Sequence, residues 1–150
     1  QFLHVLWKHI LIGLNNITLM AEQKEDKKWY VVRAVSGQEN KIKNYIVKNK
    51  LSQRIELLGH ISNNEKLKDL YFTSFFSVSP GYVGLSIIQS FGFGVPMLVS
   101  RNENHSPEIE ALNINENGLF FETNQEFNFN KVLLQAFKER EIWNKKRLAP

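Results

Sequence analysis

A loop with two glycines, set between an apolar stretch and an amphipathic stretch, is the part of the sequence best suited to binding chemistry. Pro80 and Gly81 end the apolar stretch, and Gly84 begins the amphipathic one. Glycine lets a backbone approach a ligand closely. At the start of a helix, the free N–H groups of Gly84, Leu85 and Ser86 would carry about half a positive charge. This arrangement suits a phosphate or diphosphate, although the same glycines could simply form a tight turn.

Residues 105–110 form a second candidate group, with two carboxylates in a polar loop. Glu108 and Glu110 could accept hydrogen bonds from a ligand, while Glu108 could equally stabilise the start of a short helix. His105, Ser106 and Glu108 are residue types of a hydrolase triad, but they are crowded into one loop, and a triad is defined by geometry. His60 has no second ligand at metal spacing, so we expect no metal site there.

Alternating strand and helix patterns predict an α/β fold, a Rossmann-like open parallel sheet with helices on both faces, in a single domain. The expected strands are residues 29–35, 54–58, 75–78, 95–99 and 119–121. The expected helices are residues 1–14, 39–50, a stretch capped by Asn63 or Asn64, and residues 84–91, 108–112 and 130–146. Ligands bind beyond the carboxyl ends of such strands, which places the candidate loops at residues 36–40, 59–64, 79–86 and 101–108.

The pattern P-G-x-x-G-L-x-x-x-Q-S-x-x-x-G-x-P, from Pro80 to Pro96, resembles the nucleotide-sugar signature of family-4 glycosyltransferases, which have the GT-B architecture. The proline, the loop glycine before the helix and the final G-x-P agree with the family pattern. The two glutamates of the family fall here on Gly81 and Gln89, and the form VSPGYVGL is similar to a branch that lacks the first glutamate. Gln89 can still accept a hydrogen bond from a ribose, without charge.

The resemblance covers about residues 50–125, or 29–125 if the first strand is included. It implies the carboxyl-terminal, donor-binding half of a hexosyltransferase of bacterial polysaccharide biosynthesis. The full enzyme would move a sugar from a nucleotide-diphosphate sugar to a glycan or lipid-linked acceptor, without metal or cofactor. The acceptor site and catalytic base would lie on an amino-terminal domain outside this chain, so the chain alone should bind weakly and catalyse little. The donor-binding residues that it implies are Gly37, Gly59, Gly81, Gly84, Leu85, Ser86, Gln89, Glu108 and Glu110.

A second, shorter resemblance supports an alternative. Residues 20–46, which include KKWYVVRAVSGQENK, resemble the amino-terminal start of the bacterial transcription elongation factor NusG. It implies binding to RNA polymerase and no affinity for nucleotide sugars, whereas the leading hypothesis has no nucleic-acid partner. Either the first strand unit resembles NusG by chance, or the chain has a seam near residue 47. A third interpretation is a degenerate Rossmann-like domain with no ligand.

Composition sets the outer limits. The chain has 150 residues, of which 43% are hydrophobic, enough for one domain with a core. There are no cysteines, which excludes thiolate chemistry and agrees with a cytoplasmic location. The formal charge of +4 is compatible with ordinary solubility or with phosphate-bearing partners. Residues 2–20 are apolar but interrupted, which predicts a buried helix, with a membrane-surface helix and peripheral association as the alternative. The sequence begins with Gln1, and we expect it to be part of a longer chain.

Overall fold

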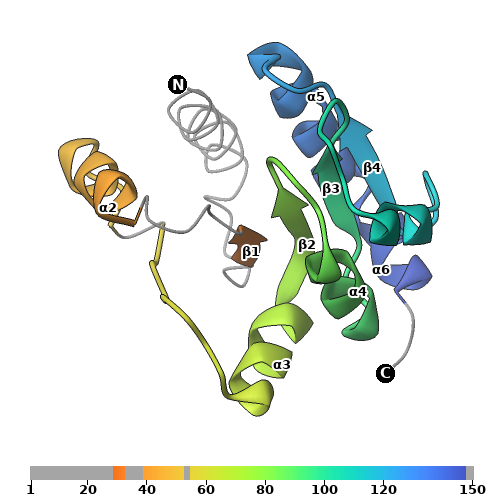
Figure 1. Cartoon of the computed structure of the whole chain (residues 1–150), viewed down its shortest axis with the longest axis horizontal. Helices are drawn as coiled ribbons and strands as arrows, with labels where there is room; N and C mark the ends of the chain where they lie inside the picture. The colour runs from red at the N-terminus through yellow and green to blue at the C-terminus, as the bar shows by residue number, and fades with distance from the viewer. Residues whose placement is uncertain (1–28, 33–38, 53–54, 148–150) are drawn as a thin grey trace.

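The computed structural model describes residues 29–32, 39–52 and 55–147. Its centre is a parallel sheet of strands in the order β1-β2-β3-β4 (Figure 1). The strands are β1 (Trp29–Val32), β2 (Ser74–Ser79), β3 (Met97–Ser100) and β4 (Gly118–Phe121). The predicted α/β fold with an open parallel sheet is therefore confirmed.

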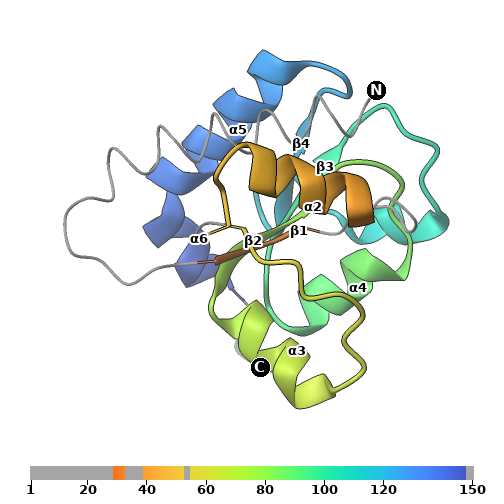
Figure 2. The ribbon, with the colours of Figure 1, turned by 90° about the vertical axis from the view of Figure 1, so that its left-hand side faces the viewer.

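Helices cover both faces of this sheet. The helices of the described residues are α2 (Glu39–Lys48), α3 (Asn64–Phe72), α4 (Leu85–Gly92), the 3₁₀-helix η1 (Pro107–Ala111), α5 (Glu126–Lys138) and α6 (Arg140–Lys146). Figure 2 shows α5 and α6 on one side of the strands and α4 on the other. The amino end of α3 confirms the predicted cap, because the side chain of Asn63 accepts a hydrogen bond from the Lys66 amide at 3.0 Å.

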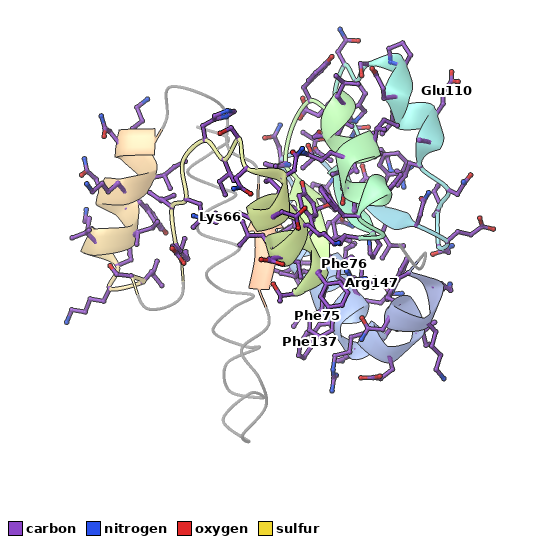
Figure 3. The ribbon with its side chains drawn as sticks, turned by 90° about the horizontal axis from the view of Figure 1, so that it is seen from below. Lys66, Phe75, Phe76, Glu110, Phe137 and Arg147 are labelled. Carbon is purple, nitrogen blue, oxygen red and sulfur yellow. The ribbon has the colours of Figure 1, made fainter. Side chains whose placement is uncertain are left out.

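The larger core lies between the sheet and the pair α5 and α6. The rings of Phe76 in β2 and Trp143 in α6 pack edge to face, with 5.4 Å between their centroids. The rings of Phe121 in β4 and Phe129 in α5 do the same at 4.8 Å. Figure 3 shows Phe75 and Phe76 close to Phe137 of α5. Each aromatic pair adds roughly 0.5–1.5 kcal/mol beyond the burial of its apolar area. This core holds the strands in place, and α4 and η1 pack on the other face of the same strands.

The smaller core, on the other face, holds α4 and η1 against the sheet. Met97 and Val99 of β3 point to this side, whereas Leu98 between them belongs to the larger core, as strand alternation requires. The helix α4 closes on β2 through small side chains, because Ser77 and Ser90 lie 2.6 Å apart and Ser90 also donates to the Val95 carbonyl at 2.8 Å. Both serines are buried, so their mutual hydrogen bonding fixes the height of α4 above the sheet.

A strand was predicted at residues 54–58, but the described residues 55–58 are irregular, and Leu57 and Leu58 are 43% and 38% exposed. Ile55 packs instead on the cluster of Ile42, Ile46 and Leu51, and its amide donates to the Leu51 carbonyl at 2.9 Å. Local packing against α2 therefore replaces pairing with the sheet. In Figure 1, α2 lies apart from the strands.

The predicted helix at residues 130–146 begins earlier, at Glu126, and is divided between α5 and α6 at Glu139. The break turns the chain so that Trp143 reaches Phe76. The predicted strand at residues 95–99 begins later, at Met97, because the Val95 amide bonds to the Ser90 carbonyl and Pro96 has no N–H. The predicted helix at residues 1–14 and the end of the first strand lie outside the described residues. Across the described ranges, no helix has both the length and the apolar character that a membrane crossing needs.

Candidate functional site

The predicted phosphate site lies where β2 ends and α4 begins. Gly84 is the N-cap residue of α4, so this helix begins without a side-chain cap, and its first turn holds no acidic residue. The amides of the first turn of a helix have no partner within the helix. The N–H groups of Leu85 and Ser86, at the start of α4, therefore have no side-chain cap. That they bind an anion stays a prediction.

An exposed apolar surface borders these amides. Tyr82, Leu85 and Ile88 are 65%, 72% and 45% exposed. Gln89 is half-buried and lies one turn from Leu85, on the same face of α4. A ligand with a phosphate at the start of α4 would therefore lie within reach of the Gln89 amide and of apolar side chains.

The backbone of Val83 joins this loop to the loop that follows β3. Its N–H donates to Nδ1 of His105 at 3.2 Å, and its carbonyl accepts from the Ser106 amide at 3.0 Å. The Ser106 hydroxyl also lies 3.0 Å from the same carbonyl. Val83 itself is fully buried. We call this set of contacts, made by Val83, His105 and Ser106, the Val83 clamp; the sequence analysis did not predict it.

Glu108 is held inside the same loop. Its carboxylate accepts a short hydrogen bond from the Ser106 hydroxyl. This hydrogen bond, and a second one from the backbone N–H of Glu108 itself, lower the pKa of the Glu108 carboxyl below its ordinary value. A hydroxyl has a single hydrogen, so the Val83 carbonyl and Glu108 compete for that of Ser106. Glu108 thus acts within the loop, in line with the alternative role considered for it.

The other predicted residues are placed less uniformly. Glu110 is exposed on η1, which packs against α4 (Figure 3). Gly81 is half-buried, and a Cβ there would meet no atom within 4 Å. Gly59 is exposed, with φ of +65°, in the segment between α2 and α3, and no hydrogen bond recorded for the described chain joins it to residues 79–86. Gly37 lies outside the described residues. The structure therefore brings residues 81–89 and 105–110 together, but not Gly59.

The charges around the site are already partly engaged. Arg101, which follows β3, pairs with Glu122 at 2.9 Å and lies over the Phe120 ring at 4.8 Å. In the ranges 29–32, 39–52 and 55–147, no three His, Asp or Glu side chains gather in a way that could hold a metal ion. The backbone amides at the start of α4 add partial positive charge at this edge of the sheet.

Comparison with known proteins gives matches of structure alone. No family model and no curated protein sequence matches the chain. A sucrose-phosphate synthase from Thermosynechococcus elongatus matches with a TM-score of 0.62 and 17% identity, over 89% of this chain and 35% of its own. A glycosyltransferase from Rickettsia africae matches with a TM-score of 0.60 and 20% identity, over 86% of this chain and 36% of its own. HepE from Anabaena, solved in complex with UDP, matches with a TM-score of 0.53 and 14% identity, over 87% of this chain and 40% of its own.

These likenesses show a shared fold. The chain has the Rossmann-like fold of a domain that occurs in structures of GT-B glycosyltransferases, as the resemblance in the sequence predicted. It spans 35%, 36% and 40% of the lengths of those three proteins, so it corresponds to a part of each. Nothing in them supports the NusG alternative, and much of residues 20–46, on which that alternative rests, lies outside the described residues.

Proposed function

We propose that the chain is the donor-binding domain of a glycosyltransferase, which transfers a sugar from a nucleotide-diphosphate sugar. The observation that carries the proposal is the uncapped first turn of α4, which follows β2 and leaves the backbone N–H groups of Leu85 and Ser86 without a side-chain partner. Its support is the fold shared with glycosyltransferase structures, one of which is a complex with UDP.

The diphosphate would bind at this first turn. The amides of Gly84, Leu85 and Ser86 would donate to its oxygens, and the dipole of α4 would favour the negative charge by about 0.3–1 kcal/mol per contact. As the bond between sugar and diphosphate breaks, negative charge grows on the leaving group. Donors that are already in place stabilise this charge without reorganisation. This chemistry needs no metal ion.

Gln89 and Glu110 would bind the remainder of the donor. Gln89 lies on the same face of α4 as the exposed Leu85, and its amide oxygen can accept a hydrogen bond from a ribose hydroxyl. Glu110 is exposed on η1, beside α4, and is free to accept a hydrogen bond from a sugar hydroxyl. Glu108 would act indirectly, because its carboxylate bonds to Ser106 in the Val83 clamp.

The acceptor, a glycan or a lipid-linked sugar, would be bound by the part of the longer protein that this chain does not span, together with any catalytic base. The chain alone would then bind nucleotide sugars weakly and turn over little of them. A dissociation constant in the millimolar range corresponds to roughly −4 kcal/mol, which a few amide contacts and one apolar surface can supply.

Isothermal titration calorimetry with UDP, GDP and their sugar conjugates tests the proposal. We expect one nucleotide to bind in preference to the other, and Gly84→Val to abolish that binding. A Cβ at Gly84 would stand 3.2 Å from the Tyr82 ring and 3.6 Å from the Ser106 hydroxyl, and the valine methyl groups would cover the amides.

Gly92→Ala is the matched control, because it changes a glycine at the other end of α4, where a Cβ meets no atom within 4 Å. Thermal unfolding followed by circular dichroism shows that both variants are folded. If all of these nucleotides fail to bind the wild-type chain at millimolar concentration, or if Gly84→Val binds as the wild type does, the proposed function is wrong.

A further inference from the structure

His105 joins the two loops of the candidate site through both of its ring nitrogens. Nδ1 lies 3.2 Å from the amide nitrogen of Val83, and Nε2 lies 2.8 Å from the carbonyl oxygen of Ser100, the last residue of β3. The ring is half-buried, and Ser100 and Val83 are fully buried. The imidazole therefore spans from the end of β3 to the loop that leads into α4.

These two partners determine the protonation state of the ring. The Val83 amide is a donor only, so Nδ1 must carry no hydrogen. The Ser100 carbonyl is an acceptor only, so Nε2 must carry one. Both contacts exist together in just one form of histidine, the neutral Nε2–H tautomer. A doubly protonated ring would set two donors against each other at Val83.

The clamped residue, Val83, comes immediately before the N-cap residue of α4. Val83 precedes Gly84, whose carbonyl accepts from the Ile87 amide at 3.2 Å in the first turn of the helix. His105 holds the N–H of the peptide between Tyr82 and Val83, and Ser106 holds the carbonyl of the next peptide, which includes the Gly84 N–H. An error in the orientation of Val83 would therefore pass to the amides of Gly84 and Leu85. Glycine at position 84 leaves this link flexible, so an external restraint is needed to fix the amide directions.

We propose that His105, as the neutral Nε2–H tautomer, is a positioning residue for diphosphate binding: it holds the Val83 N–H, and thereby the backbone that leads into α4, so that the first-turn amides of α4 converge on the ligand. This inference rests on the proposed function, because it assigns His105 a role in that same site. His105 touches no ligand in this account. Its effect passes through Val83, and Ser106 supports it by binding the Val83 carbonyl from the other side.

The first test needs no ligand. Nitrogen NMR of the imidazole in the full chain distinguishes a bare ring nitrogen from a protonated one. We expect Nδ1 of His105 to be bare and Nε2 to be protonated near neutral pH, and the Val83 amide proton to shift strongly in His105→Ala. A hydrogen on Nδ1, or a Val83 amide that does not respond to His105→Ala, overturns the inference whether or not any nucleotide binds.

The second test uses the nucleotide that the wild-type chain binds in calorimetry. We expect His105→Ala to lower the affinity for this nucleotide about two- to tenfold. A loss of this size corresponds to the loss of about one hydrogen bond. His105→Asn keeps an acceptor near the position of Nδ1, and it should recover part of the affinity. His105→Gln keeps a donor near Nε2 but loses the acceptor for Val83, and it should recover less.

Phe137→Leu is the control for a general loss of stability, because Phe137 packs against Phe75 on the other face of the sheet. It should lower the melting temperature and leave nucleotide affinity unchanged. If His105→Ala binds as tightly as the wild type, or if Asn restores no more affinity than Gln, the inference is wrong while the proposed function stands. If the wild-type chain binds no nucleotide, the proposed function fails, and the NMR experiment alone decides whether His105 holds Val83.

Discussion

The sheet that carries the site depends on a glycine at the start of β4. Gly118 is buried and pairs with Met97 of β3. A Cβ at this position would lie 2.3 Å from the Met97 carbonyl oxygen and 2.5 Å from Cδ1 of Leu112. The Leu112 side chain can turn away, but the Met97 oxygen belongs to the backbone of a central strand. Gly118→Ala must therefore move β4 against β3.

The size of the effect follows from that distance. Ordinary contact begins at 3.4 Å, so the new Cβ is about 1.1 Å too close to the oxygen. A strand shift of that size would lengthen the hydrogen bond from the Met97 amide to the Asn117 carbonyl, now 3.0 Å, to about 4 Å. The loss of about one backbone hydrogen bond and the strain of overpacking together give about 2–4 kcal/mol. Against a typical domain stability of about 5–15 kcal/mol, this is a large fraction.

Urea unfolding followed by circular dichroism measures this difference. Gly81→Ala is the control, because a Cβ at Gly81 meets no atom within 4 Å. We expect Gly81→Ala to stay within about 0.5 kcal/mol of the wild type, as is usual for substitutions without steric conflict. If Gly118→Ala is destabilised no more than Gly81→Ala, the placement of β4 beside β3 is wrong.

Three further predictions concern single side chains. Arg147→Met should lower stability by about 1.5–3 kcal/mol in the same assay, because the guanidinium donates to the carbonyls of Gly94 and Ser74 at 3.2 and 2.9 Å and to two more at the end of α3; an unchanged urea midpoint would contradict this. Ser106→Ala should raise the pKa of Glu108 toward its ordinary value, observed by carboxyl-carbon NMR. The wild type should therefore lose the stabilisation from this hydrogen bond as the pH falls through the lowered pKa, and the variant should not; equal pKa values would refute it. Gln89→Glu should tighten nucleotide binding about fivefold in calorimetry, since a charged acceptor holds a ribose hydroxyl more strongly; weaker binding would place Gln89 away from the ribose.

The central unit of the fold was predictable because its signals are local. An apolar run ending at Pro80 and Gly81, a helical period from Gly84 and a break at Pro96 are enough to predict β2, α4 and β3. The cap at Asn63 is local in the same way. At Gly94, φ of +70° agrees with the predicted end of α4, because glycine takes this conformation without strain.

The errors arose where side-chain packing overrides the pattern within a single segment. Residues 55–58 have the composition of a strand, yet Ile55 joins the cluster beside α2. The helical period from residue 130 to 146 is nearly continuous, yet the chain turns at Glu139 because Trp143 packs on Phe76. Phe76 lies 67 residues before Trp143, so no local window contains that contact. Ile55 contacts residues that are closer in the chain, but a strand pattern over residues 54–58 does not include them.

The Val83 clamp was missed for a related reason. His105 lies 22 residues after Val83, and one of its partners is a backbone amide, which leaves no mark in the sequence. The only signal was the polar loop around His105 and Ser106, which was considered for a triad and rejected on geometry. The rejection of a triad agrees with the structure, since both ring nitrogens of His105 bond to backbone groups. The loop residues thus have a structural partner that only the fold reveals.

The most direct test of the donor-binding account is a map of backbone-amide NMR shifts during titration with UDP, GDP and their sugar conjugates. The account predicts that the largest shifts occur at Gly84, Leu85 and Ser86, with smaller ones at Gln89 and Glu110. Shifts centred at the opposite end of the strands, around Gly94 and Asn117, or no shifts at millimolar nucleotide, would contradict it.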